Sequence, residues 1–128
     1  MPRVLVVDDD PDLRKTIRMA LEAHGFQVAV ASDGEEALAR QRERPAEVMI
    51  TDLFMPTRDG IETIVEFRRR FPKTRIIAMS GGGRRLRHDS LALAAEFGAE
   101  RTFRKPCDPG ALLAAVRELL ASPIQPAQ

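Results

Sequence analysis

Residues 3–11 read Arg3-Val4-Leu5-Val6-Val7-Asp8-Asp9-Asp10-Pro11, and this stretch is the strongest indication of the fold. Its apolar run predicts a short strand that is buried on both faces, as strands of parallel sheets are. Pro11 suits the first turn of a helix and Asp10 suits the N-cap before it. A buried strand therefore passes directly into a helix, and acidic residues occupy the junction.

The same alternation of strand and helix continues along the chain. Further strands are predicted at residues 26–30, 47–51, 75–79 and 101–104. The second helix follows Ser32 and Glu35, which have the spacing of a capping box, and Asp89 is a candidate cap for the fourth. The last helix begins with Asp108 as N-cap and Pro109 at its first position, and runs to about residue 121.

Short connections of this kind favour right-handed crossovers and a parallel sheet. We therefore expect an α/β fold of the (βα)5 type, a doubly wound, five-stranded parallel sheet with helices on both faces. Residues 1–121 would form this domain, and residues 122–128 a short flexible tail.

Composition narrows the class of protein. The 128 residues fit one domain, with 44% hydrophobic and 30% charged residues and a net charge of +1. That charge balance gives no reason to expect direct nucleic-acid binding. The single cysteine, Cys107, excludes an internal disulfide, and we interpret it as a small apolar filler. No signal peptide and no apolar run of about 20 residues is present, so we expect a cytoplasmic protein without a membrane partner.

Polar side chains that could bind a metal ion or take part in a reaction lie where the predicted strands end. Parallel strands bring their carboxyl ends to one edge of a sheet, where ligands bind. Clustered carboxylates repel one another and are costly to bury unless a cation neutralises them, and Mg²⁺ prefers such oxygen ligands. An aspartate can also act as a nucleophile toward phosphorus, while a lysine or a serine hydroxyl can contact phosphoryl oxygens. The residues concerned are Asp8, Asp9, Asp52, Ser80 and Lys105.

These residues stand in a recognisable order. The pieces are Val4-Leu5-Val6-Val7-Asp8-Asp9-Asp10, then Asp52-Leu53-Phe54-Met55-Pro56 with Asp59-Gly60, then Met79-Ser80, Gly98-Ala99 and Lys105-Pro106. Because it carries these motifs in this order, the chain resembles, over residues 3–121, the receiver (response regulator) domain of bacterial two-component signalling. The resemblance implies a flavodoxin-like sheet of strand order 2-1-3-4-5.

It also implies a role for each residue. Asp52 corresponds to the phosphoacceptor, which takes a phosphoryl group from a sensor histidine kinase or a histidine phosphotransfer protein. Asp8 and Asp9, with Asp52 and the backbone carbonyl of Phe54, would bind Mg²⁺. Lys105 would contact the phosphoryl group, and the Lys105–Pro106 peptide is usually cis in this family. Ser80 would be the switch hydroxyl, and phosphorylation would shift the face made by the fourth helix, the fifth strand and the fifth helix toward an unidentified downstream protein.

The chain departs from the family pattern at several positions. Thr102 stands where the family has its aromatic switch residue, and strand alternation should turn Phe103 to the opposite face. Residues 81–88 form a longer Gly- and Arg-rich segment, which we interpret as a solvated loop, with partner recognition as the alternative. Phe54 would shield an acyl phosphate from water, which a comparison of autodephosphorylation in wild type and Phe54→Asn would test.

Two other functions stay open. Asp8 and Asp10 have the Asp-x-Asp spacing that opens phosphatases of the haloacid dehalogenase type, with Asp8 as nucleophile and Asp10 as acid/base. The second open function is that of a degenerate receiver, which acts only as an interaction module. We prefer a stand-alone receiver, since no output domain follows residue 121. We also expect a signalling domain rather than an enzyme, because it would catalyse only its own phosphorylation and dephosphorylation.

Overall fold

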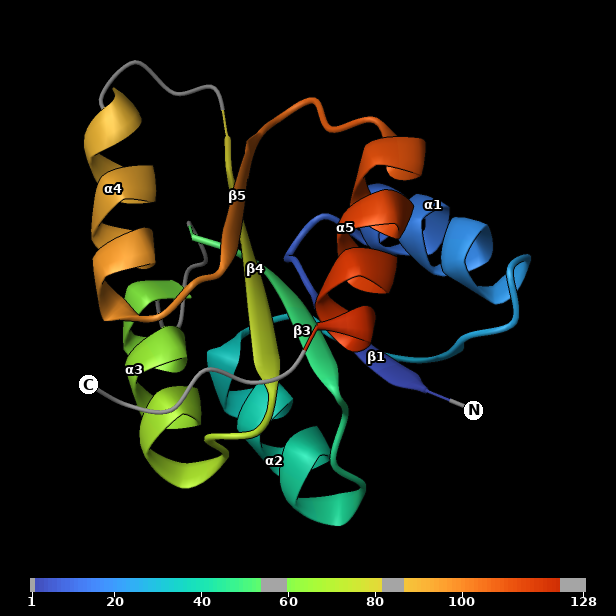
Figure 1. Ribbon diagram of the computed structural model, residues 1–128, viewed down its shortest axis with the longest axis horizontal. Helices are drawn as coiled ribbons and strands as arrows, with labels where there is room; N and C mark the ends of the chain where they lie inside the picture. Colours follow the sequence, from blue (N-terminus) through green and yellow to red (C-terminus); the bar gives the residue numbers. More distant parts are fainter. Residues whose placement is uncertain (1, 54–59, 82–86, 123–128) are drawn as a thin grey trace.

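The computed structural model describes residues 2–53, 60–81 and 87–122, with side chains 87–90 excepted. Strands and helices alternate without interruption (Figure 1). They are β1 (Arg3–Val7), α1 (Pro11–Glu22), β2 (Gln27–Ala31), α2 (Gly34–Glu43), β3 (Val48–Asp52), α3 (Gly60–Arg70), β4 (Arg75–Ser80), α4 (Arg87–Phe97), β5 (Arg101–Arg104) and α5 (Pro109–Ala121). The expected (βα)5 arrangement is confirmed.

All strand pairs are parallel, in the order β2-β1-β3-β4-β5. Helices α1 and α5 cover one face of the sheet, and α2, α3 and α4 cover the other (Figure 1). Successive residues of one strand enter different cores: Leu5 packs with the α2–α3–α4 face and Val6 with the α1–α5 face. Burial on both faces explains why the central strands are apolar almost throughout.

The helix starts follow local hydrogen bonding. As predicted, Asp10 caps α1, and its Oδ1 accepts from the Asp12 N–H at 3.0 Å. The expected capping box of Ser32 and Glu35 is wrong by one residue. Asp33 is the N-cap of α2 and accepts from the Glu36 N–H at 2.9 Å, because its side chain reaches that third helical amide.

The carboxylate of Glu36 returns to Ser32, accepting from its N–H at 2.7 Å and from its hydroxyl at 2.9 Å. These hydrogen bonds hold the pKa of Glu36 below its ordinary value, and the one from the Ser32 backbone has the largest effect. Burial of the carboxylate acts in the opposite direction.

Other boundaries lie close to expectation. Strand β2 begins one residue later than predicted, at Gln27, and α5 ends at Ala121 as predicted. Asp108 stands at the N-cap of α5, but its side chain makes no capping hydrogen bond. The proposed cap at Asp89 is wrong, because α4 already begins at Arg87. Residues 123–128, which were expected to form a tail, lie outside the described residues.

Candidate functional site

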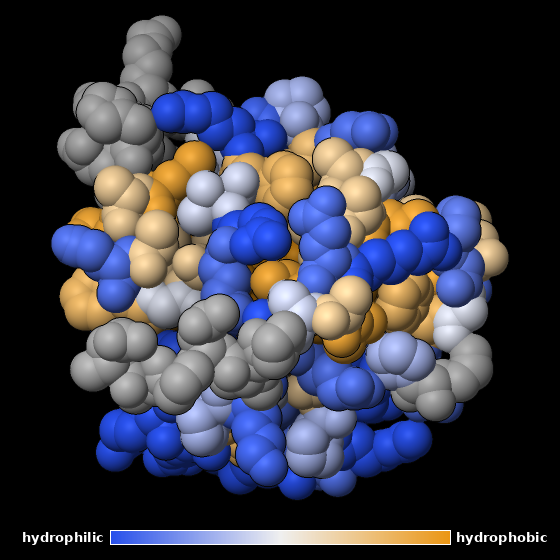
Figure 2. Space-filling model, viewed as in Figure 1, coloured by the Kyte–Doolittle hydropathy of each residue, from blue (hydrophilic) through white to orange (hydrophobic). Residues whose placement is uncertain are grey.

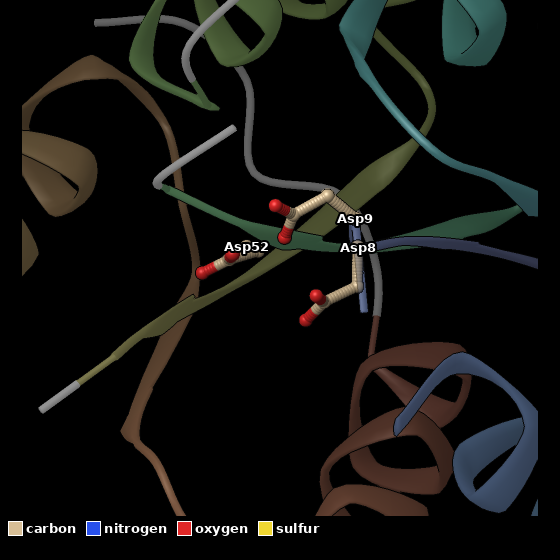
Figure 3. Close-up of side chains that lie close together, drawn as sticks. All are labelled: Asp8, Asp9 and Asp52. Carbon is tan, nitrogen blue, oxygen red and sulfur yellow. The ribbon is translucent and has the colours of Figure 1, made fainter. Parts of the chain in front are cut away.

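Three aspartates meet at the carboxyl edge of the two central strands. Asp8 and Asp9 follow β1, and Asp52 is the last residue of β3, which pairs directly with β1. One carboxylate oxygen from each lies within 4.8 Å of those from the other two. Figure 3 shows their side chains gathered around a shared space. The convergence predicted from the order of these residues is therefore present in the structure.

Asp8 is the most constrained of the three. It is fully buried, whereas Asp9 beside it is exposed. Its Oδ1 accepts from the Asp10 N–H at 2.9 Å, and its Oδ2 accepts from Lys105 Nζ at 2.7 Å. The carboxylate is therefore held by two protein donors, while Asp9 is exposed to solvent.

Lys105 joins the site from the loop after β5. Its Nζ lies 2.7 Å from Asp8 Oδ2 and 3.4 Å from Asp52 Oδ2. Burial of the ammonium lowers its pKa, but the hydrogen bond to Asp8 and the charge of Asp52 outweigh this, so the pKa of Lys105 lies above its ordinary value. Lys105 therefore stays protonated, and its charge faces the carboxylates.

The donor set fits a hard divalent cation. Three carboxylates supply the oxygen ligands that Mg²⁺ prefers, and one nearby lysine leaves the group with a net negative charge. Asp8, Asp9 and Asp52 are the described residues that could hold this ion, in agreement with the sequence prediction. The fourth predicted ligand, the carbonyl of Phe54, lies outside the described residues.

Ser80 lies at the same edge. It is the last residue of β4 and is buried, and its hydroxyl lies 3.4 Å from the carbonyl oxygen of Gly81, to which it donates. The Ser80 carbonyl accepts from the Lys105 N–H at 2.8 Å. Because this bond ties the end of β4 to the Lys105 loop, the predicted switch serine and the predicted lysine lie on neighbouring backbones.

Strand β5 places Thr102 and Phe103 on different faces, as alternation predicts. Thr102 is exposed and pairs with Ala78, which faces the α2–α3–α4 core. Phe103 pairs with Met79 and packs against the α1–α5 core. Phe103 therefore cannot take the place of the aromatic switch residue that the family has at the position of Thr102.

The Lys105–Pro106 peptide is cis, as the family resemblance implied. The sequence-based interpretation of residues 81–88 as a loop is only partly applicable. Residues 82–86 lie outside the described residues, and residues 87 and 88 belong to α4.

Arg14 lies near the site but was not among the site residues predicted from the sequence. Arg14 of α1 donates from Nη1 to the backbone carbonyl of Asp8 at 2.8 Å. Its position four residues after the N-cap Asp10 is the only signal the sequence offered. Cys107 is half-buried against the α1–α5 core. Burial is the largest cause that raises the pKa of its thiol, and the charges of Asp8 and Asp52 add to it, while the charge of Lys105 acts in the opposite direction. This environment agrees with its interpretation as an apolar filler.

The phosphatase alternative does not match the geometry. It requires Asp8 as nucleophile, but both oxygens of the Asp8 carboxylate accept hydrogen bonds, from the Asp10 N–H and from Lys105 Nζ. It also requires Asp10 as acid/base, but the Asp10 carboxylate caps α1. The arrangement instead leaves Asp52 beside both Lys105 and the acidic pair.

Comparisons with known proteins give the family. Residues 4–117 match the response regulator receiver domain, and the chain belongs to that family. It is 34% identical over 120 residues to the transcriptional regulatory protein CpxR of Klebsiella pneumoniae, covering 94% of this chain and 50% of that protein. A CheY-like receiver domain protein from Methanospirillum hungatei JF-1 is similar in structure, with a TM-score of 0.86, 25% identity and 94% of both chains covered. The BeF3-activated DrrB receiver domain matches with a TM-score of 0.85 and 28% identity, covering 95% of this chain and 99% of that one.

These matches confirm the flavodoxin-like receiver fold with strand order 2-1-3-4-5. The chain spans about half the length of the curated relatives it matches, which are named transcriptional regulatory proteins. Within residues 2–53, 60–81 and 87–122, no helix has the length and apolar character needed to cross a bilayer.

Proposed function

We propose that this receiver domain accepts a phosphoryl group on Asp52 from a phosphohistidine of a sensor histidine kinase or a histidine phosphotransfer protein. The observation that carries the proposal is the meeting of Asp8, Asp9 and Asp52 within 4.8 Å, with Lys105 Nζ 3.4 Å from Asp52. In a member of the receiver family, this is the arrangement that an aspartyl phosphate needs.

The chemistry follows from the positions of these groups. An oxygen of Asp52 attacks the phosphorus of the phosphohistidine, so that a P–O bond forms while the P–N bond breaks and the departing imidazole nitrogen takes up a proton. Lys105 is already close enough to Asp52 to contact an oxygen of the transferred group. Mg²⁺ held by Asp8, Asp9 and Asp52 would reduce the repulsion between these carboxylates and an incoming phosphoryl group.

Phosphorylation of Asp52 would signal by changing the surface that the domain presents to a partner. Ser80 Oγ would leave the Gly81 carbonyl for a phosphoryl oxygen, which would rearrange the end of β4 and the face made by α4, β5 and α5. Thr102 lies on β5 within that face and would replace the family's aromatic residue with a small exposed one. The partner would be a protein that binds this face, and we propose no direct nucleic-acid contact by residues 1–128. The expected cytoplasmic location stays a prediction.

Phosphorylation of the purified chain tests the proposal. Incubation with a small phosphodonor and Mg²⁺ should add one phosphoryl group, which mass spectrometry should locate on Asp52. Asp52→Asn should abolish the modification, and chelation of the metal should prevent it. Asp12→Asn, which removes an exposed carboxylate from the first turn of α1, is the matched control and should be modified normally.

The same experiment separates the alternatives. A folded wild type that takes no phosphoryl group in the presence of Mg²⁺ would support the degenerate receiver. Sustained turnover of a phosphoester that is lost in Asp8→Asn would support the phosphatase. If Asp52 is modified, capture of partners on the protein held with beryllofluoride would identify the downstream protein.

A further inference from the structure

The backbone of Asp8 is fixed on both sides by hydrogen bonds. Its N–H donates to the Ala31 carbonyl of β2 at 3.1 Å. Its carbonyl accepts from Arg14 Nη1 of α1 at 2.8 Å. Because the Asp8 side chain is held as well, by the Asp10 N–H and Lys105 Nζ, every polar atom of this residue has a protein partner.

The constraint passes to the next residue. A peptide unit is planar, so fixing the Asp8 carbonyl also fixes the N–H and the Cα of Asp9. Within the described part of the chain, the exposed Asp9 carboxylate makes no hydrogen bond that would orient it. Its direction toward Asp8 and Asp52, visible in Figure 3, therefore depends on the position of the backbone that carries it.

We propose that Arg14 is a positioning residue for the acidic site. Its hydrogen bond to the Asp8 carbonyl holds the Asp8–Asp9 peptide in the orientation that brings the Asp9 carboxylate to the metal position. Arg14 thereby sets the affinity of the site for Mg²⁺ without touching the ion or the phosphoryl group. This inference rests on the proposed function, because it assigns Mg²⁺ to the three aspartates.

Magnesium binding by purified variants tests the inference. Calorimetric titration with Mg²⁺ should give a Kd about tenfold higher for Arg14→Met than for wild type, the loss expected when a partner of a ligand-bearing group is removed. The Mg²⁺ concentration that half-saturates phosphorylation of Asp52 should rise by the same factor. The rate at saturating Mg²⁺ should stay near that of wild type, because Asp52 and Lys105 are unchanged.

Two further variants separate positioning from charge. Arg14→Lys can still donate to the carbonyl and should recover part of the affinity. Arg18→Met removes a cation one turn further along the same helix and should leave the Kd near that of wild type. Removal of a positive charge would by itself tighten Mg²⁺ binding, and salt would screen that effect, whereas a loss of positioning should weaken Mg²⁺ binding and should persist when the titration is repeated at high ionic strength.

The outcomes are distinct from those of the proposed function. Wild type that binds no Mg²⁺, or is not modified on Asp52, overturns the proposed function itself. Wild type that binds Mg²⁺ while Arg14→Met binds equally well overturns only the role of Arg14. The role is also overturned if Arg18→Met loses as much affinity, or if Arg14→Met binds Mg²⁺ as tightly as wild type at high ionic strength. Should Arg14→Met fail to fold, Arg14→Leu carries the same comparison.

Discussion

The two neighbouring aspartates after β1 have different environments. Sequence alone assigns Asp8 and Asp9 the same task, since both follow a buried strand. In the structure, Asp8 is buried and bonded to Lys105, while Asp9 is exposed. Burial of the Asp8 charge is tolerable because Lys105 and the Asp10 N–H compensate it. Asp8 therefore ties β1 to the loop after β5, and Asp9 is the solvent-exposed member of the pair.

Gly60 lies directly against Asp52, the proposed phosphoacceptor. A Cβ at this position would lie 2.4 Å from the carbonyl oxygen of Asp52 and 2.6 Å from the Cα of Leu53. We predict that Gly60→Ala lowers the free energy of unfolding by about 1–3 kcal/mol, because backbone atoms must move to admit the methyl group. It should also slow the proposed phosphorylation of Asp52, since the displaced backbone includes that of Asp52. Urea unfolding and the phosphorylation rate measure the two effects.

Gly81→Ala is the matched control for this substitution. Gly81 follows Ser80, the proposed switch serine, at the same edge of the sheet, but a Cβ there meets no atom of the described residues within 4 Å. Its stability should stay within about 0.5 kcal/mol of wild type. Equal stability of Gly60→Ala and wild type would show that α3 can shift away from Asp52 at no cost.

At the scale of elements, the sequence predicts most boundaries because strong local signals mark them. Asp10 with Pro11 marks the start of α1, and Gly25, which adopts a φ of +91°, lies just after its end. The prediction failed where two candidate caps compete. Ser32 and Asp33 both precede α2, and only the geometry of the folded turn shows that Asp33 reaches the Glu36 amide.

Helices α4 and α5 are anchored unequally. Among the described side chains of α4, Ala94 is fully buried and Leu91 partly buried, while Leu93 and Phe97 are each 46% exposed. Apolar surface is visible on the α4 side of Figure 2. Helix α5 instead buries a full apolar stripe, made of Leu112, Leu113, Ala115, Val116 and Leu119. A helix with so little buried apolar surface should open at a lower free energy than its neighbour.

We therefore predict that the backbone amides of α4 exchange with deuterium faster than those of α5 in the unphosphorylated protein. Native-state hydrogen exchange followed by mass spectrometry measures this, and peptides from α1 serve as an internal reference. Equal protection of α4 and α5 would mean that contacts other than apolar burial anchor α4. The prediction matters for signalling because elements that move in a switch are drawn from the less stable parts of a fold.

For the whole molecule, the location of the site is predictable and its supporting contacts are not. Parallel pairing carries the ends of β1 and β3 to one edge, so the meeting of Asp8 and Asp52 follows from topology. The bond from Arg14 to the Asp8 carbonyl depends on the path of one long side chain across a helix turn. No periodicity in the sequence encodes that path, which is why the cluster of aspartates was predicted and the contact of Arg14 was not.

Arg75 lies at the opposite edge of the sheet, and its burial was likewise not predictable. It begins β4 and is only 7% exposed. Its Nε donates to Glu100 Oε2 at 2.8 Å, and its Nη1 donates to the carbonyls of Leu119 and Ser122 at 2.7 and 2.8 Å. One guanidinium therefore joins β4 to the residue before β5 and to the carboxyl end of α5, where helix carbonyls attract a cation.

We predict that Arg75→Met destabilises the fold by about 2–3 kcal/mol without weakening Mg²⁺ binding. The loss falls below the roughly 3–5 kcal/mol of a fully buried ion pair, because Glu100 keeps some contact with water. Magnesium affinity should not change, because the strand separates Arg75 from Ser80 and the acidic site by about 17 Å. Arg101→Met is the matched control: it removes an exposed pair, 3.7 Å from Glu118, and should lower stability by less than about 1 kcal/mol. Urea unfolding and Mg²⁺ titration of both variants make the comparison, and a lower Mg²⁺ affinity in Arg75→Met would show that the two edges of the sheet are coupled.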